Sequence, residues 1–154
     1  SEKMKKKTDS VTIIKKLGKD DAIYGLGDKP GCLNKRGYSY VNWNTDDPAP
    51  HVDSFKSLYK SIPFFIVLGD EYCYGIFADN TYKTTFDFGY ENTDYYFVEH
   101  EKGELDYYFM PGNDMAEVVG LYTSLQAPHR FIRDGYTAAI RAAGAITRRM
   151  RCLI

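Results

Sequence analysis

The chain has 154 residues, of which 44% are hydrophobic and 27% charged, and a formal net charge of −1. This length fits one domain with a sizeable core, and the near-neutral charge argues against a nucleic acid or a membrane surface as partner. No apolar run approaches the roughly 18 residues of a transmembrane helix, so a membrane-spanning helix is not expected.

Aromatic residues make up 16% of the chain, with 14 tyrosines and 9 phenylalanines, a composition typical of a tyrosine-rich β protein. The three cysteines, Cys32, Cys73 and Cys152, show no CxxC spacing. They indicate reduced thiols in a cytoplasmic protein. No histidine or cysteine pair has metal-ligand spacing, so we expect neither a metal site nor a cofactor.

The N-terminal part of the chain predicts a basic arm followed by short strands. Residues 1–10 form a basic arm with no apolar signal core behind it. Strands are expected at Val11–Lys16 and Ala22–Gly27. Arg36–Trp43 alternates tyrosines with small polar residues, and this period of two predicts a strand with an exposed face.

The central part of the chain predicts a meander of short antiparallel strands. Ile62–Leu68 is continuously apolar, as in a strand covered on both faces, and a turn leads from it to Cys73–Asp79 as a hairpin. Thr81–Gly89 has one aromatic and one polar face. Two further strands are expected at Asp94–Glu99 and Glu104–Met110.

After Pro111 the period changes to that of a helix. We expect Asn113 to cap it and Asp114 and Glu117 to suit its positive end. The apolar stripe consists of Met115, Val118, Val119 and Tyr122 and ends near Leu125. The chain is therefore predicted to be mainly β: an antiparallel β-sandwich over residues 11–126 with a C-terminal connector helix.

Residues 127–154 differ in composition. Alanine becomes common, and six arginines lie there: Arg130, Arg133, Arg141, Arg148, Arg149 and Arg151. Apolar residues from Tyr136 to Ile154 step by three and four, which allows a basic amphipathic helix on the parent domain. The alternative interpretation is a non-native or frame-shifted tail.

The long segment from Tyr24 to Phe65 is the expected functional region. It holds Trp43, the single tryptophan, and then two adjacent carboxylates and two prolines that stiffen the backbone. A loop of this length between core strands is usually functional or disordered, and its aromatic content argues against disorder.

Several ordered blocks, YGLGDKPGCLNKRG, WNTDDPAPH, LYKSIPFF, YGIFADNTYKTTFDFG and GELDYYFMPGNDMAEVVGLYTSL, resemble the N-terminal domain of family-31 glycoside hydrolases, the α-glucosidases and α-xylosidases. The resemblance covers about residues 20–126. It implies a galactose-mutarotase-like β-sandwich packed against a (β/α)8 barrel that this chain lacks. It also implies more strands before the YGLG block than Val11–Lys16 supplies.

The family resemblance implies a retaining mechanism with two carboxyl groups about 5–5.5 Å apart, both supplied by the barrel. The WxDMNEP-like segment of the nucleophile does not occur here. We therefore expect no catalytic residue in this chain and no hydrolysis by the chain alone.

Substrate recognition is what the resemblance leaves to this domain. Its loop, Asn44–Asp47 here, would reach over the barrel mouth and touch an α-glucoside or oligosaccharide in the leaving-group subsite. Asp46 is the first candidate, Asp47 the second, and Trp43 could offer an apolar face to the ring. A carboxylate accepts strong hydrogen bonds from vicinal hydroxyls. The alternative is an Asx-turn before Pro48 without further function.

Other polar residues are interpreted structurally. His51, His100 and His129 are expected at the surface. Lys35 and Arg36 are expected to steady the loop by pairing with Asp28 or Asp46.

We expect Asp79 and Asp87 to be turn and strand-edge residues, and Glu104 and Asp106 to lie on the wet face of a strand. Gly25-x-Gly27 lacks the third glycine of a dinucleotide site, which excludes that interpretation.

Three functions stay open from the sequence. The first is the N-terminal sandwich of a retaining α-glucosidase. The second is a self-standing carbohydrate-binding module, and the third is an interaction domain without ligand. If the first holds, the face that normally covers the barrel is exposed, and self-association is expected.

Overall fold

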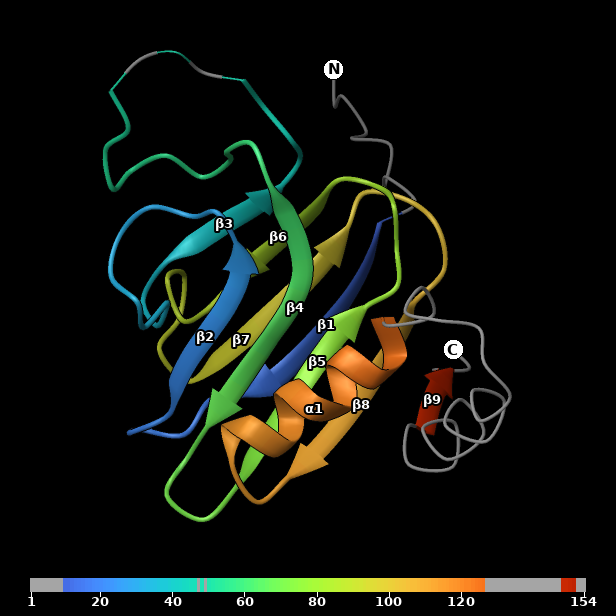
Figure 1. Ribbon diagram of the computed structural model, residues 1–154. Helices are drawn as coiled ribbons and strands as arrows, with labels where there is room; N and C mark the ends of the chain where they lie inside the picture. Colours follow the sequence, from blue (N-terminus) through green and yellow to red (C-terminus); the bar gives the residue numbers. More distant parts are fainter. Residues whose placement is uncertain (1–9, 47, 49, 127–147, 152–154) are drawn as a thin grey trace, which may run out of the picture.

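The computed structural model describes residues 10–46, 48, 50–126 and 148–151. Two antiparallel sheets face each other, and a single described helix lies on the outer face of one of them (Figure 1). One sheet has the strand order β1-β7-β6-β3, the other β2-β4-β5-β8-β9. The prediction of a mainly-β antiparallel sandwich with a C-terminal helix is confirmed.

The elements follow the predicted strands closely. They are β1 (Val11–Lys16), β2 (Ala22–Gly27), β3 (Ser39–Asn42), β4 (Ser61–Leu68), β5 (Cys73–Ala78), β6 (Thr84–Asp87), β7 (Tyr95–His100), β8 (Asp106–Gly112), α1 (Met115–Gln126) and β9 (Arg148–Arg151). In the described part of the chain, no helix combines the length and the apolarity needed to cross a membrane.

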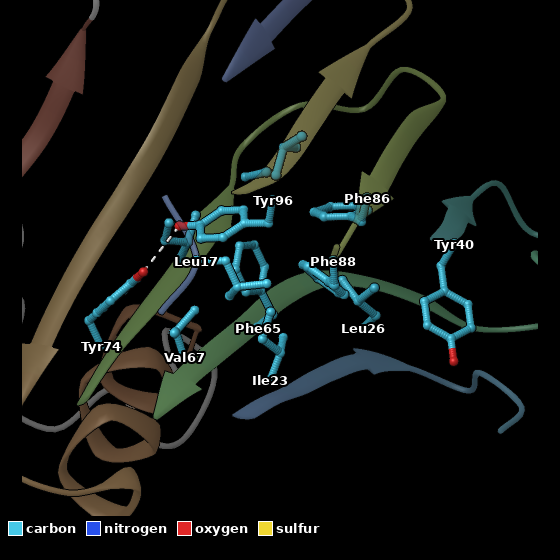
Figure 2. Packing of buried hydrophobic residues seen from close by; sticks show 13 residues of the cluster. Leu17, Ile23, Leu26, Tyr40, Phe65, Val67, Tyr74, Phe86, Phe88 and Tyr96 are labelled. Carbon is cyan, nitrogen blue, oxygen red and sulfur yellow. Dashed lines mark hydrogen bonds between the residues drawn. The ribbon is translucent and has the colours of Figure 1, made fainter. Parts of the chain in front are cut away.

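The main core fills the space between the sheets and combines aromatic rings with aliphatic side chains (Figure 2). Phe65 of β4 is fully buried, and its ring centroid lies 4.9 Å from that of Phe88 and 5.5 Å from that of Tyr96. The Tyr74 and Tyr96 hydroxyls, one from each sheet, are 3.3 Å apart and form a hydrogen bond inside the core. This bond satisfies two polar groups that would otherwise be costly to bury.

Strand β4 is covered on both faces, as its continuous apolar run predicts. Phe65 and Val67 point into the core between the sheets, whereas Phe64 and Ile66 face helix α1. The helix lies across β4, β5 and β8 (Figure 1). A second apolar cluster therefore joins the helix to the sandwich.

The predicted helix stripe is partly wrong. Val118 is fully buried, and Leu121, Tyr122 and Leu125 pack on the same cluster. Met115 and Val119, by contrast, are 39% and 45% exposed. The periodicity permits either stripe, and the sheet selects the one that covers Phe64 and Ile66.

The helix cap also differs from the prediction. Asp114, not Asn113, is the capping residue: its Oδ1 accepts the Glu117 N–H at 2.8 Å. The Glu117 carboxylate in turn accepts the Asn113 backbone N–H at 2.9 Å. This reciprocal arrangement resembles a capping box and satisfies donors that the first helical turn leaves free.

The strands do not form a sequential meander, which corrects that prediction. The chain crosses from β5 to β6 in the other sheet, continues to β7, and then returns to β8, which pairs with β5. The crossing places the aromatic face of β6 against β4. Each sheet thereby buries the apolar face of the other.

Two polar positions are more buried than expected. β3 turns Tyr40 and Asn42 inward, so only its other face is partly exposed. Asp87, predicted on a polar strand face, is buried and accepts the Tyr90 N–H at 2.9 Å and the Glu91 N–H at 3.3 Å. It therefore stabilises a turn, in agreement with its expected structural role.

Residues 148–151 of the tail form strand β9, not part of the helix that the spacing of the tail would allow. It pairs antiparallel with the edge strand β8, Asp106 opposite Arg151. An edge strand offers unpaired backbone groups that another segment can use. The other predicted tail positions, 127–147 and 152–154, lie outside the described residues.

Candidate functional site

The loop between β3 and β4, residues 43–60, extends beyond the sandwich at one end (Figure 1). Its base is anchored: the Val41 N–H donates to the Lys56 carbonyl at 2.8 Å and the Thr45 N–H to the Leu58 carbonyl at 3.2 Å. Leu58 is buried. The Ser57 hydroxyl also donates to the Trp43 carbonyl. The base therefore has a defined conformation.

Two of the three predicted sugar-contacting residues are described, and both are exposed. The Trp43 side chain is 55% exposed, and Asp46 is also exposed, three residues further along the loop. Asp47 lies outside the described residues. The structure therefore places an indole and a carboxylate near the start of one anchored loop.

The preceding glycine-rich segment is held by cations, but not through the predicted ion pairs. Lys35 Nζ donates to the Lys29 and Pro30 carbonyls at 3.1 Å each, and Arg36 Nη1 donates to the Gly18 carbonyl at 2.6 Å. Backbone carbonyls, rather than Asp28 or Asp46, receive these side chains. The turns of this segment bring several carbonyls together, and each accepts a hydrogen bond without being charged.

Lys29 connects the glycine-rich segment to β3 and β4, the strands before and after the long loop. Its Nζ donates to the Val41 carbonyl at 3.3 Å and to Ser61 Oγ at 3.4 Å. Burial lowers the pKa of Lys29 to about 8, because the charged form loses hydration that these neutral acceptors replace only in part. Lys29 therefore links β3 to β4 just below the loop.

A hollow of about 450 Å³ opens beside the base of the loop, at the end of the sandwich. It lies between the two sheets and the β5–β6 turn. Its walls are Asn42, Trp43, Asn44, Ser61, Pro63, Asn80, Thr81, Tyr82 and Thr84. All of these side chains are uncharged, and the two large rings, Trp43 and Tyr82, are about half exposed.

A polar row crosses the inner face of the sheet beside the hollow. Asn42 of β3 is opposite Thr84 of β6, which is opposite His100 of β7. All three are buried, and His100 Nδ1 lies 2.8 Å from Thr84 Oγ1. Within the described residues, both amide atoms of Asn42 and Nε2 of His100 have no hydrogen-bond partner.

The hydrogen bonds determine the tautomer of His100. Thr84 Oγ1 donates its only proton to the Tyr82 carbonyl at 3.0 Å, so the proton shared with His100 must come from Nδ1. Burial lowers the pKa of His100, which keeps the ring neutral. His100 therefore positions Thr84, and the prediction of a surface histidine is wrong for this residue.

The other polar candidates divide between surface and interior. His51 is exposed, as predicted, whereas His129 lies outside the described residues. Glu104 is exposed, but Asp106 is buried, contrary to the predicted wet face. Cys32 is exposed and Cys73 buried, both as free thiols.

Asn42 and Tyr82 were not singled out from the sequence. The alternation in Arg36–Trp43 places Asn42 on the same face as Tyr40. A polar residue at the end of an inward-facing strand face is the local sign that Asn42 could have a function. Its position beside a hollow depends on strands distant in sequence. Local patterns could not provide it.

The two facing sheets, the outer helix and the exposed loop define an antiparallel β-sandwich domain. A family model described as the glycosyl hydrolase 31 N-terminal galactose mutarotase-like domain matches residues 1–87. The chain belongs to this glycoside hydrolase family and represents its N-terminal sandwich. The resemblance carried by the ordered sequence blocks, and the galactose-mutarotase-like fold it implies, are thereby confirmed.

Two curated relatives illustrate the family. Alpha-glucosidase 2 of Bacillus thermoamyloliquefaciens is 44% identical over 115 residues, which cover 75% of this chain and 14% of the relative. The alpha-xylosidase XylQ of Lactiplantibacillus pentosus is 34% identical over 109 residues, 71% of this chain and 13% of the relative. The chain therefore spans about one seventh of the length of these relatives.

Solved structures agree with this assignment. A dextranase of Flavobacterium johnsoniae, solved as a mutant in complex with isomaltotriose, superposes with a TM-score of 0.70 at 45% identity, covering 77% of this chain and 14% of the dextranase. The cycloalternan-degrading enzyme of Trueperella pyogenes, with a TM-score of 0.65 at 17% identity, covers 81% of this chain and 17% of that enzyme, and supports the fold alone.

Proposed function

We propose that this chain is the N-terminal sandwich of a retaining α-glucosidase and that its β3–β4 loop forms part of the sugar-binding subsite. The observation that supports this function is the anchored loop presenting Trp43 and Asp46 to solvent. The sequence similarity to an alpha-glucosidase over most of this chain supports the substrate class.

The chemistry of the loop suits a sugar. An ionised Asp46 accepts hydrogen bonds from two neighbouring hydroxyls, and charge-assisted bonds of this kind are stronger than neutral ones. The exposed indole of Trp43 offers an apolar surface to the C–H groups of a pyranose ring. Asp47 is the second candidate for the same contact.

The cleavage itself is assigned to a barrel domain outside residues 11–126. A retaining mechanism needs a carboxylate nucleophile and a carboxylic acid–base on opposite sides of the scissile bond. We assign neither role to a residue of this domain. Its contribution is to hold the leaving-group sugar, which improves the orientation of the bond to be broken.

A chimera tests this function. Residues 11–126 replace the corresponding domain of alpha-glucosidase 2 of Bacillus thermoamyloliquefaciens, and the hydrolysis of maltose and isomaltose is measured. We expect Asp46→Asn to lower kcat/KM by roughly tenfold or more, because a hydrogen bond to a charged group contributes about 1.5–3 kcal/mol. Asp70→Asn, an exposed carboxylate in the β4–β5 turn, is the matched control.

Equal activity of Asp46→Asn and Asp70→Asn in an active chimera would contradict the proposed contact. The alternative, a self-standing carbohydrate-binding module, predicts micromolar binding of maltose or isomaltose by the 154-residue chain alone. The α-glucosidase domain predicts only millimolar binding, because the barrel side of the subsite is missing.

Self-association follows from the same proposal. We expect the surface that would cover the barrel to be solvent-exposed when the 154 residues are studied alone, and exposed apolar surface favours association. Sedimentation at increasing protein concentration is expected to show species larger than the monomer. A strictly monomeric chain at high concentration would contradict this part.

A further inference from the structure

We infer that the hollow between the sheet ends is itself a binding site for a neutral mono- or disaccharide, with Asn42 as its polar anchor and Tyr82 and Trp43 as its ring contacts. This site goes beyond the proposed loop contact, because most of its lining lies on β3, β4, β6 and the β5–β6 turn, with only Trp43 and Asn44 from the loop. It requires neither the barrel nor a carboxylate.

The first argument is the chemistry of the walls. Asparagine amides, hydroxyls, a proline and two aromatic rings line the hollow, and none of its lining residues is charged. Such a surface provides neutral donors and acceptors for hydroxyl groups and apolar faces for C–H groups. It offers no counter-charge for a phosphate, a carboxylate or an ammonium group.

The second argument is the unmet hydrogen-bonding capacity of Asn42. The residue is more than nine-tenths buried and lines the hollow, yet neither amide atom has a partner in the described part of the chain. Leaving a buried polar group unpaired costs about 1–3 kcal/mol. Both amide atoms are shielded from solvent, so the side chain must turn toward the hollow when a sugar binds, and it can then donate to one hydroxyl and accept from its neighbour.

The third argument is that the rim is held in place before any ligand binds. Asn80 Nδ2 donates to the Lys102 and Glu104 carbonyls at 3.1 Å each, and its Oδ1 accepts the Tyr82 N–H at 2.8 Å. The Thr84 hydroxyl fixes the Tyr82 carbonyl. A backbone fixed at both its N–H and its carbonyl reduces the entropy lost when a ligand contacts the ring.

The size of the hollow agrees with this ligand class. Small-molecule sites in proteins usually measure about 300–1,000 Å³, and this hollow, at about 450 Å³, lies in that range. It is open to solvent on one side. We therefore expect weak, saturable binding in the millimolar range rather than tight capture.

The test uses the whole chain, labelled with 15N and titrated with isomaltose, with glucose and with glycerol as a polyol control. Trp43 is the single tryptophan, so its indole N–H gives one resolved signal at the hollow. We expect saturable shifts of this signal with the sugars and none with glycerol. Tyr82→Ala is expected to weaken binding roughly tenfold, whereas Tyr90→Ala, an exposed tyrosine outside the hollow, leaves it unchanged.

A second variant separates a binding role of Asn42 from a structural one. Asn42→Leu replaces the unpaired amide with an apolar group of similar size, so the free energy of unfolding is expected to stay equal or rise while sugar binding is lost.

The inference is overturned if no saturable shift occurs, if glycerol gives the same shift, or if Tyr82→Ala and Asn42→Leu both bind like the wild type. Tyr82→Ala and Asn42→Leu test the hollow in the chain alone, whereas Asp46→Asn tests the loop in the chimera, so the two proposals fail on different variants.

Discussion

The rings of Phe64 and Tyr122 stack face to face, with centroids 3.9 Å apart and planes at 5°. Phe64 belongs to β4 and Tyr122 to α1, so this contact ties the helix to the outer face of the sheet. The helix follows β8 in the chain and stays packed on the outer face of the sheet. The contact makes the helix part of the folded domain.

Removing this ring contact should destabilise the domain. We expect Tyr122→Ala to lower the free energy of unfolding by about 2–4 kcal/mol, because it leaves a void beside Phe64 and ends the stacking. Val119→Ala, on the exposed side of the same helix, should change it by less than about 0.5 kcal/mol. Urea unfolding measures both. Equal losses would contradict the role assigned to the Phe64–Tyr122 contact, because both substitutions introduce the same good helix former.

Two glycines should respond in opposite directions to alanine. Gly25 has φ 134°, and a Cβ there would lie 2.4 Å from the Phe64 carbonyl oxygen. Gly25→Ala should therefore lower the free energy of unfolding by more than about 2 kcal/mol. A Cβ on Gly120 of α1 meets nothing within 4 Å. Gly120→Ala should raise stability by about 0.5–1 kcal/mol. Thermal unfolding checks both signs.

The helix cap can be assigned by three substitutions. Asp114→Ala should cost about 1 kcal/mol, because the Glu117 N–H loses its acceptor, whereas Asp114→Asn should keep most of that stability. Asn113→Ala removes only a surface bond to Glu117 and should cost less than about 0.5 kcal/mol. A larger loss for Asn113→Ala than for Asp114→Ala would reverse this assignment.

The stability of the domain should rise with pH above about 8. Lys29 has a pKa of about 8 in the folded chain and its ordinary pKa of about 10.5 in the unfolded chain, so between these values the unfolded chain binds more protons than the folded one. Unfolding then becomes less favourable as pH increases through this window. Above about pH 10 the trend reverses, because burial raises the pKa of Tyr96 and the unfolded chain loses phenolic protons first.

Lys29→Met isolates this effect. The variant should show a smaller rise in unfolding free energy from pH 8 to pH 10 in denaturant titrations. A residual slope should persist, because burial also lowers the pKa of Lys15. An unchanged slope in Lys29→Met would contradict the assignment of the pH dependence to Lys29.

The sequence by itself determined which segments become strands and where the helix lies. The continuous apolar run of β4 also predicted its burial on both faces, because no solvent-facing side chain interrupts Ile62–Leu68. The ordered sequence blocks identified the family. These features are local, or are carried by residues in fixed order, so they can be read without knowing which strands pair.

Only the tertiary structure decided which sheet each strand joins and which polar residues are buried. His100, Asp87 and Asp106 look like surface residues in sequence, but neighbouring strands or turns enclose them. The hollow beside Asn42 arises because the end of β3 and the start of β6 lie next to the start of β4. Periodicity distinguishes the two faces of a strand, whereas long-range pairing determines what covers each face.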